Sequence, residues 1–457
     1  MRAQFQYWLT KYFSGESFDH HFVFALLGPV VVDQFFLVSF NFLNTAMIAS
    51  SGEAAISAVN MVGSVNVFLI QIFVAVGLGG TVLIAQYFGA GERQLLGRVV
   101  NGAVYGAVLV GLGLALVFGA LHNGLLSLLF GAASPAVMAN ARLYMLGVLV
   151  SYPFEALVEG TNGCLRGIGR TANSLQLSLA MNLMYLLFNL VTITWLHLGV
   201  VGMIIALNLS RWLAAVLAGW MLVSHRELFA LRWRVMRRID WRMLRRVIIV
   251  CIPFAAESFF FNGGKILIQM MIVGLGTRVI VTWAIGGSWT SLSEIIPSAL
   301  GTALVPLVGQ SMGRGNVADA RKITKSFVGL GILAFALVDA VLVLSFSRGI
   351  QLFSPAPAIV PAIFACYLIF LVWHLLAWAF SFILPNALRA AGDGKFTTTV
   401  SLVCMWAFRV VGVYVFGLRL GYGLPGVCLI MSLEWALRGL IFIHRFRGDR
   451  WHRQHLI

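Results

Sequence analysis

The stretch VVNGAVYGAVLVGLGLALVFGAL, residues 99–121, indicates the fold class because it is apolar and carries no charged side chain. A helix of about 20 such residues spans a lipid bilayer, and residues 175–196 form a second run of this kind. The 457-residue chain is 60% hydrophobic and only 11% charged, against roughly 25% charged residues in soluble proteins. The short alternating segments of an outer-membrane barrel are absent. We therefore predict an all-α polytopic membrane protein.

Apolar runs separated by polar residues predict about twelve membrane-spanning helices. Their expected cores are 22–49, 54–85, 98–121, 136–163, 173–196, 199–223, 247–274, 279–309, 324–346, 357–385, 397–417 and 423–444. Several of these runs exceed the thickness of the hydrocarbon core, so tilted helices are expected.

The basic residues are distributed unevenly over the predicted loops. Of the 32 lysines and arginines, 25 lie on the side of the N-terminus, and the opposite loops hold only Arg278, Arg348 and Arg419. Because cytoplasmic loops are enriched in Lys and Arg, we expect both termini in the cytoplasm. The net charge of +16 then reflects topology and contact with lipid headgroups, and no nucleic-acid partner is expected.

Neither the cysteines nor the N-terminus suggests secretion. The five cysteines lie at or inside apolar runs without a C-x-x-C pattern, so we expect neither a disulfide framework nor a metal site. The first residues, MRAQFQYWLTKYFSGESFDHH, have no apolar core of a signal peptide, and no cleavage is expected.

The sequence contains an internal duplication. Gln86-x-x-Gly89-x-Gly91 recurs as Gln310-x-x-Gly313-x-Gly315, and Leu165-Arg166-x-x-Gly169 recurs as Leu388-Arg389-x-x-Gly392. With six spans in each copy, the repeats are parallel, and we predict two six-helix lobes related by an axis along the membrane normal, with the binding cavity between them. The expected division is an N-terminal lobe 1–223, a basic cytoplasmic linker 224–246 and a C-terminal lobe 247–457. The glycine motifs follow helices and are interpreted as tight turns that need φ > 0, not as phosphate loops.

One pair of acids occupies equivalent positions in the two copies. Asp33 follows Pro29 by four residues, and Glu257 follows Pro253 by four residues. A charge inside a membrane span is costly and usually faces a cavity or carries ions. We interpret Asp33 and Glu257 as the coupling and substrate carboxylates, with charges near helix ends as the alternative.

Six segments resemble the multidrug and toxic compound extrusion (MATE) transporters. They are GEAAISAVNMVGSVN (52–66), GGTVLIAQYFGAGE (79–92), LRGIGRTANS (165–174), IPFAAESFFFNGGK (252–265), LVGQSMGRGN (307–316) and LRAAGDGKF (388–396). Each motif is loose, but their order and spacing are specific and cover nearly the whole chain. The resemblance implies export of organic, often cationic, compounds driven by inward H⁺ or Na⁺ through alternating access.

The chain departs from the family late in span one. Many members carry an acid in a V-D-T motif there, and the matching stretch here is Leu43-Asn44-Thr45. Asn44 lies within about 20° of Asp33 around an ideal helix and roughly 16 Å further along it. Asn41 and Asn44 are therefore expected to line the cavity as neutral groups, and we add Gln34 and Asn262 to the expected lining.

Further polar residues lie inside the spans. Lys265 and Glu294 are expected at the site, with a structural Lys265–Glu294 pair as an equally open alternative. We expect Glu159 to pair with Arg166 at a helix end, although Glu155 and Glu159 could instead share a proton. Structural roles are expected for the pair Glu434–Arg438 and for the anchors Arg211 and Arg409, and Asp339 is placed near the outer end of span nine.

The sequence thus predicts a cation-coupled antiporter of the bacterial cytoplasmic membrane that works as a monomer. No cofactor is expected, and the coupling ion is H⁺ or Na⁺, which could bind at Asp33 or Glu257. A flippase for lipid-linked oligosaccharides is the nearest alternative, and it should have a more cationic cavity. An intramembrane enzyme is disfavoured because His374 is the only histidine deep within a span and no catalytic arrangement is evident.

Overall fold

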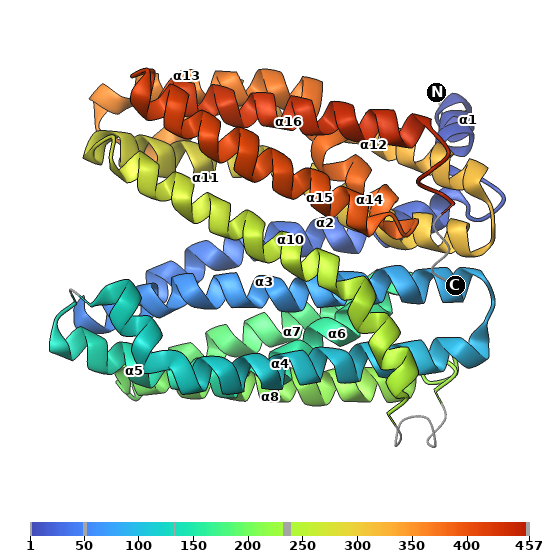
Figure 1. Ribbon diagram of the computed structural model, residues 1–457, viewed down its shortest axis with the longest axis horizontal. Coiled ribbons are helices and arrows are strands. Elements are labelled where there is room, and N and C mark those ends of the chain that lie inside the picture. Colours follow the sequence, from blue (N-terminus) through green and yellow to red (C-terminus); the bar gives the residue numbers. More distant parts are fainter. Residues whose placement is uncertain (1, 49–52, 132, 232–238, 454–457) are drawn as a thin grey trace. The chain divides into compact units, whose positions relative to one another are not determined.

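A computed structural model describes residues 2–48, 53–131, 133–231 and 239–453, and every regular element in these ranges is a helix (Figure 1). Helices suit the bilayer because they satisfy all their backbone hydrogen bonds internally. Prolines interrupt this pattern at only a few positions inside long helices, among them Pro29 and Pro253. The chain forms two compact units, each described here by itself.

The first unit described is the continuous range Phe35–Ala255. It contains the later part of α2 (His20–Ile48), then α3 (Glu53–Gly89), α4 (Arg93–Phe130), α5 (Pro135–Val150), α6 (Tyr152–Gly167), α7 (Thr171–Asn189), the π-helical η1 (Leu190–Trp195), α8 (Gly199–Ser224) and the start of α10 (Trp241–Val273). Helix α6 packs against both α3 and α4, and α7 packs against α8. A side chain at Gly163 would collide with the backbone carbonyl of Gly77, so α3 and α6 approach closely because both positions are glycine.

The second unit combines Met1–Gln34 with Ala256–Ile457. It contains α1 (Arg2–Phe13), the first part of α2, most of α10, α11 (Thr277–Gly313), α12 (Val317–Gly349), the short η2 (Ile350–Phe353) and η3 (Pro357–Ile359), α13 (Val360–Trp373), the π-helical η4 (His374–Ile383), α14 (Leu384–Ala390), α15 (Gly394–Val403), the π-helical η5 (Cys404–Val410) and η6 (Val413–Arg419), and α16 (Gly423–Arg447). Helix α11 packs against α12, and η4 packs against α12 and α16.

Both unit boundaries fall inside long helices. The first lies in α2 shortly after Pro29, and the second lies in α10 shortly after Pro253. The two helices that contain Asp33 and Glu257 are thus each shared between the compact units. The division of the duplicated sequence into lobes 1–223 and 247–457 stays a prediction.

The length and composition of the helices confirm a polytopic membrane protein. Within the described residues, 11 helices are long and apolar enough to cross a membrane, and the number is twelve if the pair α5 and α6, bent by 44°, is counted as one span. Large apolar side chains point outward from these helices: Leu116 is 73% exposed and Leu344 is 86% exposed. Such side chains are stable next to lipid tails and would be costly in water.

The predicted glycine turns are confirmed. The last glycine of the first motif, Gly91, has φ 73°, and its repeat counterpart Gly315 has φ 76°. Both conformations are left-handed and favour glycine over residues with a Cβ. All five cysteines are buried and free.

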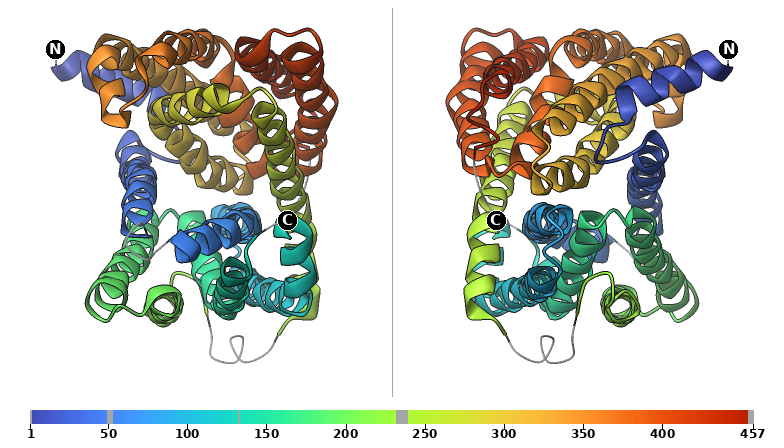
Figure 2. Two further views of the ribbon diagram at one scale, coloured as in Figure 1. Left: turned by 90° about the vertical axis from the view of Figure 1, so that its left-hand side faces the viewer. Right: turned by 90° about the vertical axis from the view of Figure 1, so that its right-hand side faces the viewer.

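Helix α1 was not predicted, and it lies along α12 (Figure 2). The chain after it is bound to the start of α12: Lys322 Nζ donates to the carbonyl of Ser14 at 2.6 Å, and the amide of Ser17 donates to Asp319 at 2.6 Å. The mean hydropathy of α1 is too low for this helix to be identified as a membrane span.

Candidate functional site

Glu257 lies in the interior of α10 and forms an ion pair with an arginine of the duplicated motif. Arg389 Nη2 donates to Glu257 Oε1 at 2.5 Å, and Thr398 Oγ1 donates to Oε2 at 3.2 Å. The side chains of Glu257 and Arg389 are each 14% exposed. The motif explains this geometry, because Gly392, with φ 102°, turns the chain from α14 to α15 and so brings both donors to one carboxylate.

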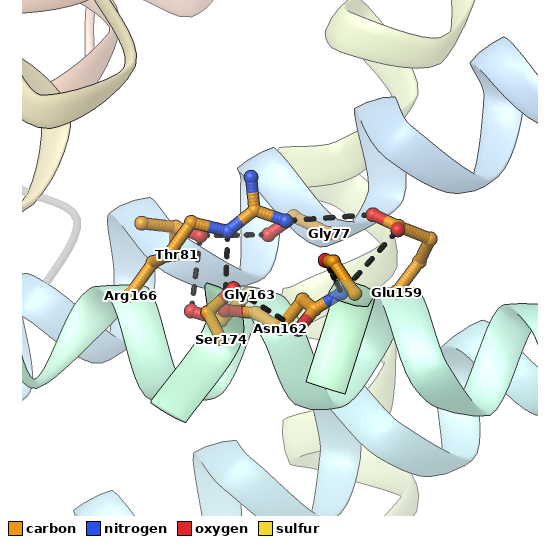
Figure 3. A network of polar contacts seen from close by, with 8 residues as sticks. Gly77, Thr81, Glu159, Asn162, Gly163, Arg166 and Ser174 are labelled. Carbon is orange, nitrogen blue, oxygen red and sulfur yellow. Dashed lines mark hydrogen bonds and ion pairs between the residues drawn. The ribbon is translucent and has the colours of Figure 1, made fainter. Parts of the chain in front are cut away.

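The repeat-related arginine has a different partner. Arg166 Nη2 lies 3.4 Å from Glu159 Oε2, which confirms the predicted helix-end pair. Asn162 joins this network by donating to Glu159 at 3.4 Å and accepting from Ser174 at 3.0 Å (Figure 3). Arg166 and Arg389 therefore occupy equivalent positions in the two LRxxG motifs but form ion pairs with carboxylates at different positions of the repeat.

Glu155 belongs to a separate buried cluster. Arg211 Nε lies 3.0 Å from Glu155 Oε2, and Arg211 Nη1 donates to Ser151 Oγ at 2.6 Å. Each of these acids thus has its own arginine, so the structure favours ion pairs over a proton shared between Glu155 and Glu159. Arg211 is the internal anchor that the sequence predicted.

Asp33 and the neutral polar residues expected at the site lie on two helices, α2 and α10. Asp33 and Gln34 are partly buried in α2. Asn262 is partly buried in α10 and donates to the carbonyl of Ser258 at 2.8 Å, one helical turn earlier. Asn41 and Asn44 fall within the range of α2, and their side chains lie outside the described part of the structure.

Further along α10, three cationic side chains surround one aromatic ring. Lys265 Nζ lies 5.2 Å from the centroid of Phe261, and the guanidinium carbons of Arg409 and Arg438 lie 5.5 Å and 5.6 Å from it. These distances are within the range of cation–π attraction. Glu434, fully buried, pairs with Arg409 and lies 3.5 Å from Arg438. The predicted Glu434–Arg438 pair and the anchoring role of Arg409 are thereby confirmed.

Lys265 and Glu294 interact electrostatically across α10 and α11. Lys265 is exposed, and the Glu294 side chain is 34% exposed. Charged side chains in mid-span contact protein or water rather than lipid. Lys265 and Glu294 are thus within electrostatic range of each other, whereas Glu257 forms its ion pair with Arg389.

A buried histidine connects Glu294 to a second acid, and sequence reasoning missed this connection. His374, at the start of η4, is 0% exposed. Its Nδ1 lies 3.2 Å from Asp339 Oδ2, and its Nε2 lies 3.8 Å from Glu294 Oε1. Tyr367 donates to the other oxygen of Asp339 at 2.9 Å. The depth of His374 in its span was the available signal, but spacing alone could not pair it with acids on α11 and α12.

Within the described residues, no group of three or more His, Cys, Asp or Glu side chains is arranged to hold a metal ion. The polar groups inside the spans instead form ion pairs and hydrogen-bonded networks. A polytopic helical protein with such charged groups in its spans has the features of a membrane transporter.

Comparison with known proteins identifies the family. The MatE family model matches residues 29–193 and 253–415, and the chain belongs to this family, the MATE transporters. The uncharacterized transporter YisQ of Bacillus subtilis is 24% identical over 94% of each chain. The multidrug resistance protein PmpM of Pseudomonas aeruginosa is 25% identical over 88% of this chain and 83% of its own.

Solved structures show the same fold. A MATE in complex with MaD3S gives a TM-score of 0.86 at 16% identity, covering 93% of this chain and 95% of that one. An outward-facing multidrug resistance MATE transporter gives 0.85 at 17% identity, covering 93% of this chain and 94% of that one. The protein is thus a multi-pass transporter of the MATE fold, a family of transporters and not of enzymes.

Proposed function

We propose that the protein is a cation-coupled antiporter that exports organic cations by alternating access. It would act in the bacterial cytoplasmic membrane with both termini in the cytoplasm. Family membership supports transport, and relatives such as PmpM are named multidrug resistance proteins. The uneven distribution of Lys and Arg supports the orientation.

The observation that carries this proposal is the Glu257–Arg389 pair inside a membrane span. At 2.5 Å, with both side chains 14% exposed, the pair is stable only while Glu257 is ionised. Breaking a buried pair by neutralising one partner costs about 3–5 kcal/mol. A proton or Na⁺ that binds Glu257 competes with Arg389 and releases the arginine. The pair thus has two states, formed and broken, and Glu257 lies close in sequence to the point where α10 passes from one compact unit to the other.

Substrate recognition is assigned to the exposed carboxylate. Glu294 is accessible at 34% and offers a negative charge to an organic cation. The rings of Phe261 and Phe382, whose centroids lie 5.6 Å and 4.3 Å from the guanidinium of Arg438, are the aromatic faces assigned to an organic cation. Asp33, partly buried in α2, is the carboxylate of the first repeat and the repeat counterpart of Glu257 rather than of Glu294.

The cations around Phe261 favour one alternative, a flippase that binds the diphosphate of a lipid-linked oligosaccharide. Lys265, Arg409 and Arg438 all lie within 5.6 Å of that ring. However, Glu434 lies between the two arginines and Glu294 lies beside Lys265. These carboxylates neutralise much of the positive charge, so the geometry favours cation export.

Reconstituted transport tests the proposal. Purified protein in liposomes is supplied with tetraphenylphosphonium, a lipophilic organic cation, under separately imposed pH and Na⁺ gradients. The proposal expects accumulation against the probe's gradient with at least one of the two ions. Asp240→Asn is a suitable control, because its ion pair with Arg98 is 3.8 Å long and the Arg98 and Asp240 side chains are 53% and 35% exposed. Absence of uphill transport under both gradients would contradict the proposal.

A further inference from the structure

His374 occupies a fully buried position between two carboxylates. Its ring stacks on Phe335 with the centroids 4.5 Å apart and on Trp435 at 5.9 Å, so its orientation is fixed. Both oxygens of Asp339 face donors, since Tyr367 binds Oδ1 at 2.9 Å and His374 Nδ1 lies 3.2 Å from Oδ2. These contacts satisfy an ionised Asp339, and they place a hydrogen on His374 Nδ1.

The other ring nitrogen then determines where a further proton must lie. His374 Nε2 is buried without a hydrogen-bond partner in the structure and lies 3.8 Å from Glu294 Oε1. With Nδ1 protonated, the neutral ring presents a lone pair at Nε2. A lone pair facing an ionised carboxylate in a buried setting is unfavourable. One proton is therefore held between Glu294 and His374, either on the carboxyl group or on the imidazolium.

Only one end of this chain of groups is open to its surroundings. Glu294 is 34% exposed, whereas His374 is 0% exposed and Asp339 is 2% exposed. The start of η4 is π-helical, and π-helical turns often occur at functional sites. A proton that enters from water must therefore pass through Glu294 before it reaches the histidine.

Positively charged side chains near Glu294 oppose a proton held there, so this proton can be exchanged. Lys265 on α10 is a positive charge within electrostatic range of Glu294, and Arg409 and Arg438 lie around the same Phe261 ring as Lys265. Glu434 on α16 compensates those arginines. An organic cation that contacts the partly exposed Glu294 carboxylate adds one more positive charge and disfavours a proton held there.

We propose that Glu294, His374 and Asp339 form a proton relay, in which an organic cation bound at Glu294 displaces the proton shared by Glu294 and His374. The inference rests on the proposed antiport and assigns H⁺ as its coupling ion. In the loading step, the Glu294 carboxyl gives its proton to Nε2, and the imidazolium holds it between Glu294 and Asp339. In the release step, Nε2 returns the proton through Glu294 to water, and no other atom is transferred.

Binding of tetraphenylphosphonium to purified protein at several pH values tests the relay. If one proton competes with tetraphenylphosphonium, the affinity of the protein for this probe rises about tenfold for each unit of increasing pH, over the pH range in which the relay is protonated. For His374→Gln and for Glu294→Gln, we expect the affinity to change less than about twofold per unit between pH 6 and 8. Since Glu294 is partly exposed, Glu294→Gln keeps the fold even if the stacked His374 site tolerates no change. His225→Gln, at the end of α8, serves as the histidine control and should keep the wild-type slope.

The outcomes separate the relay from the antiport itself. A wild-type pH slope in both variants would overturn the relay. Export by the wild-type protein that is driven by Na⁺ alone would overturn the relay and leave the antiport proposal intact. Failure of either gradient to drive export would overturn both, whereas H⁺-driven export with flat binding in the two variants would support both.

Discussion

Replacing Arg389 by Gln removes the partner of Glu257, and its cost can be worked from the geometry. The ion pair is 2.5 Å long, and both side chains are 14% exposed. Removing one partner of a fully buried pair costs about 3–5 kcal/mol. The small remaining exposure lowers this figure, so we expect about 2–4 kcal/mol for Arg389→Gln.

A double-mutant cycle isolates the interaction of the two residues. Arg389→Gln, Glu257→Gln and the double variant are purified in detergent, and their unfolding is followed by intrinsic tryptophan fluorescence. We expect a coupling energy of about 2 kcal/mol or more, because the two side chains share one short contact. The surface pair Arg98–Asp240, at 3.8 Å with side chains 53% and 35% exposed, is the matched control and should give less than about 1 kcal/mol. Equal coupling in the two pairs would refute the assignment of Glu257 and Arg389 as a stabilising buried pair.

Three further changes have defined expectations. Gly315→Ala forces a Cβ into a turn with φ 76° and should destabilise the protein by about 1–2 kcal/mol. Gly113→Ala on α4, where a Cβ meets open space, should have little effect, and unfolding followed by tryptophan fluorescence compares the two variants. Lys265→Met removes a positive charge near Glu294 and should raise tetraphenylphosphonium affinity about fivefold, corresponding to about 1 kcal/mol of lost repulsion; a lower affinity would favour the flippase. Neutralising arginines in 224–246 should change orientation or yield in membranes far more than the substrate profile, and unchanged orientation with a changed profile would contradict this.

Much of the fold could be predicted because the bilayer imposes simple rules on sequence. Runs such as 99–121 gave the spans through their length alone. The duplicated motifs predicted the left-handed turns at Gly91 and Gly315, since few other residues adopt that conformation. Helix α1 escaped prediction because it is too short and too polar to resemble a span.

The candidate site was less predictable, because sequence spacing reports neighbours on one helix only. The pairs Glu159–Arg166 and Glu434–Arg438 are local and were predicted correctly. Glu257 and Arg389 are 132 residues apart, and the duplication singled out both without showing that they meet.

The same reasoning applies to the histidine. His374 was recognised as deep within a span and Asp339 as lying toward the outer end of another, but nothing in the sequence joined them. Only the packing of η4 against α12 places Nδ1 beside Asp339.

The central claim is that carboxylates inside the spans couple the ion to the substrate. The most direct test compares Asp33→Asn and Glu257→Gln with the wild-type protein in liposomes, using uphill tetraphenylphosphonium transport and counting inserted protein by quantitative immunoblot. The account predicts that each variant inserts normally and loses uphill transport. Full uphill transport by both variants would contradict it.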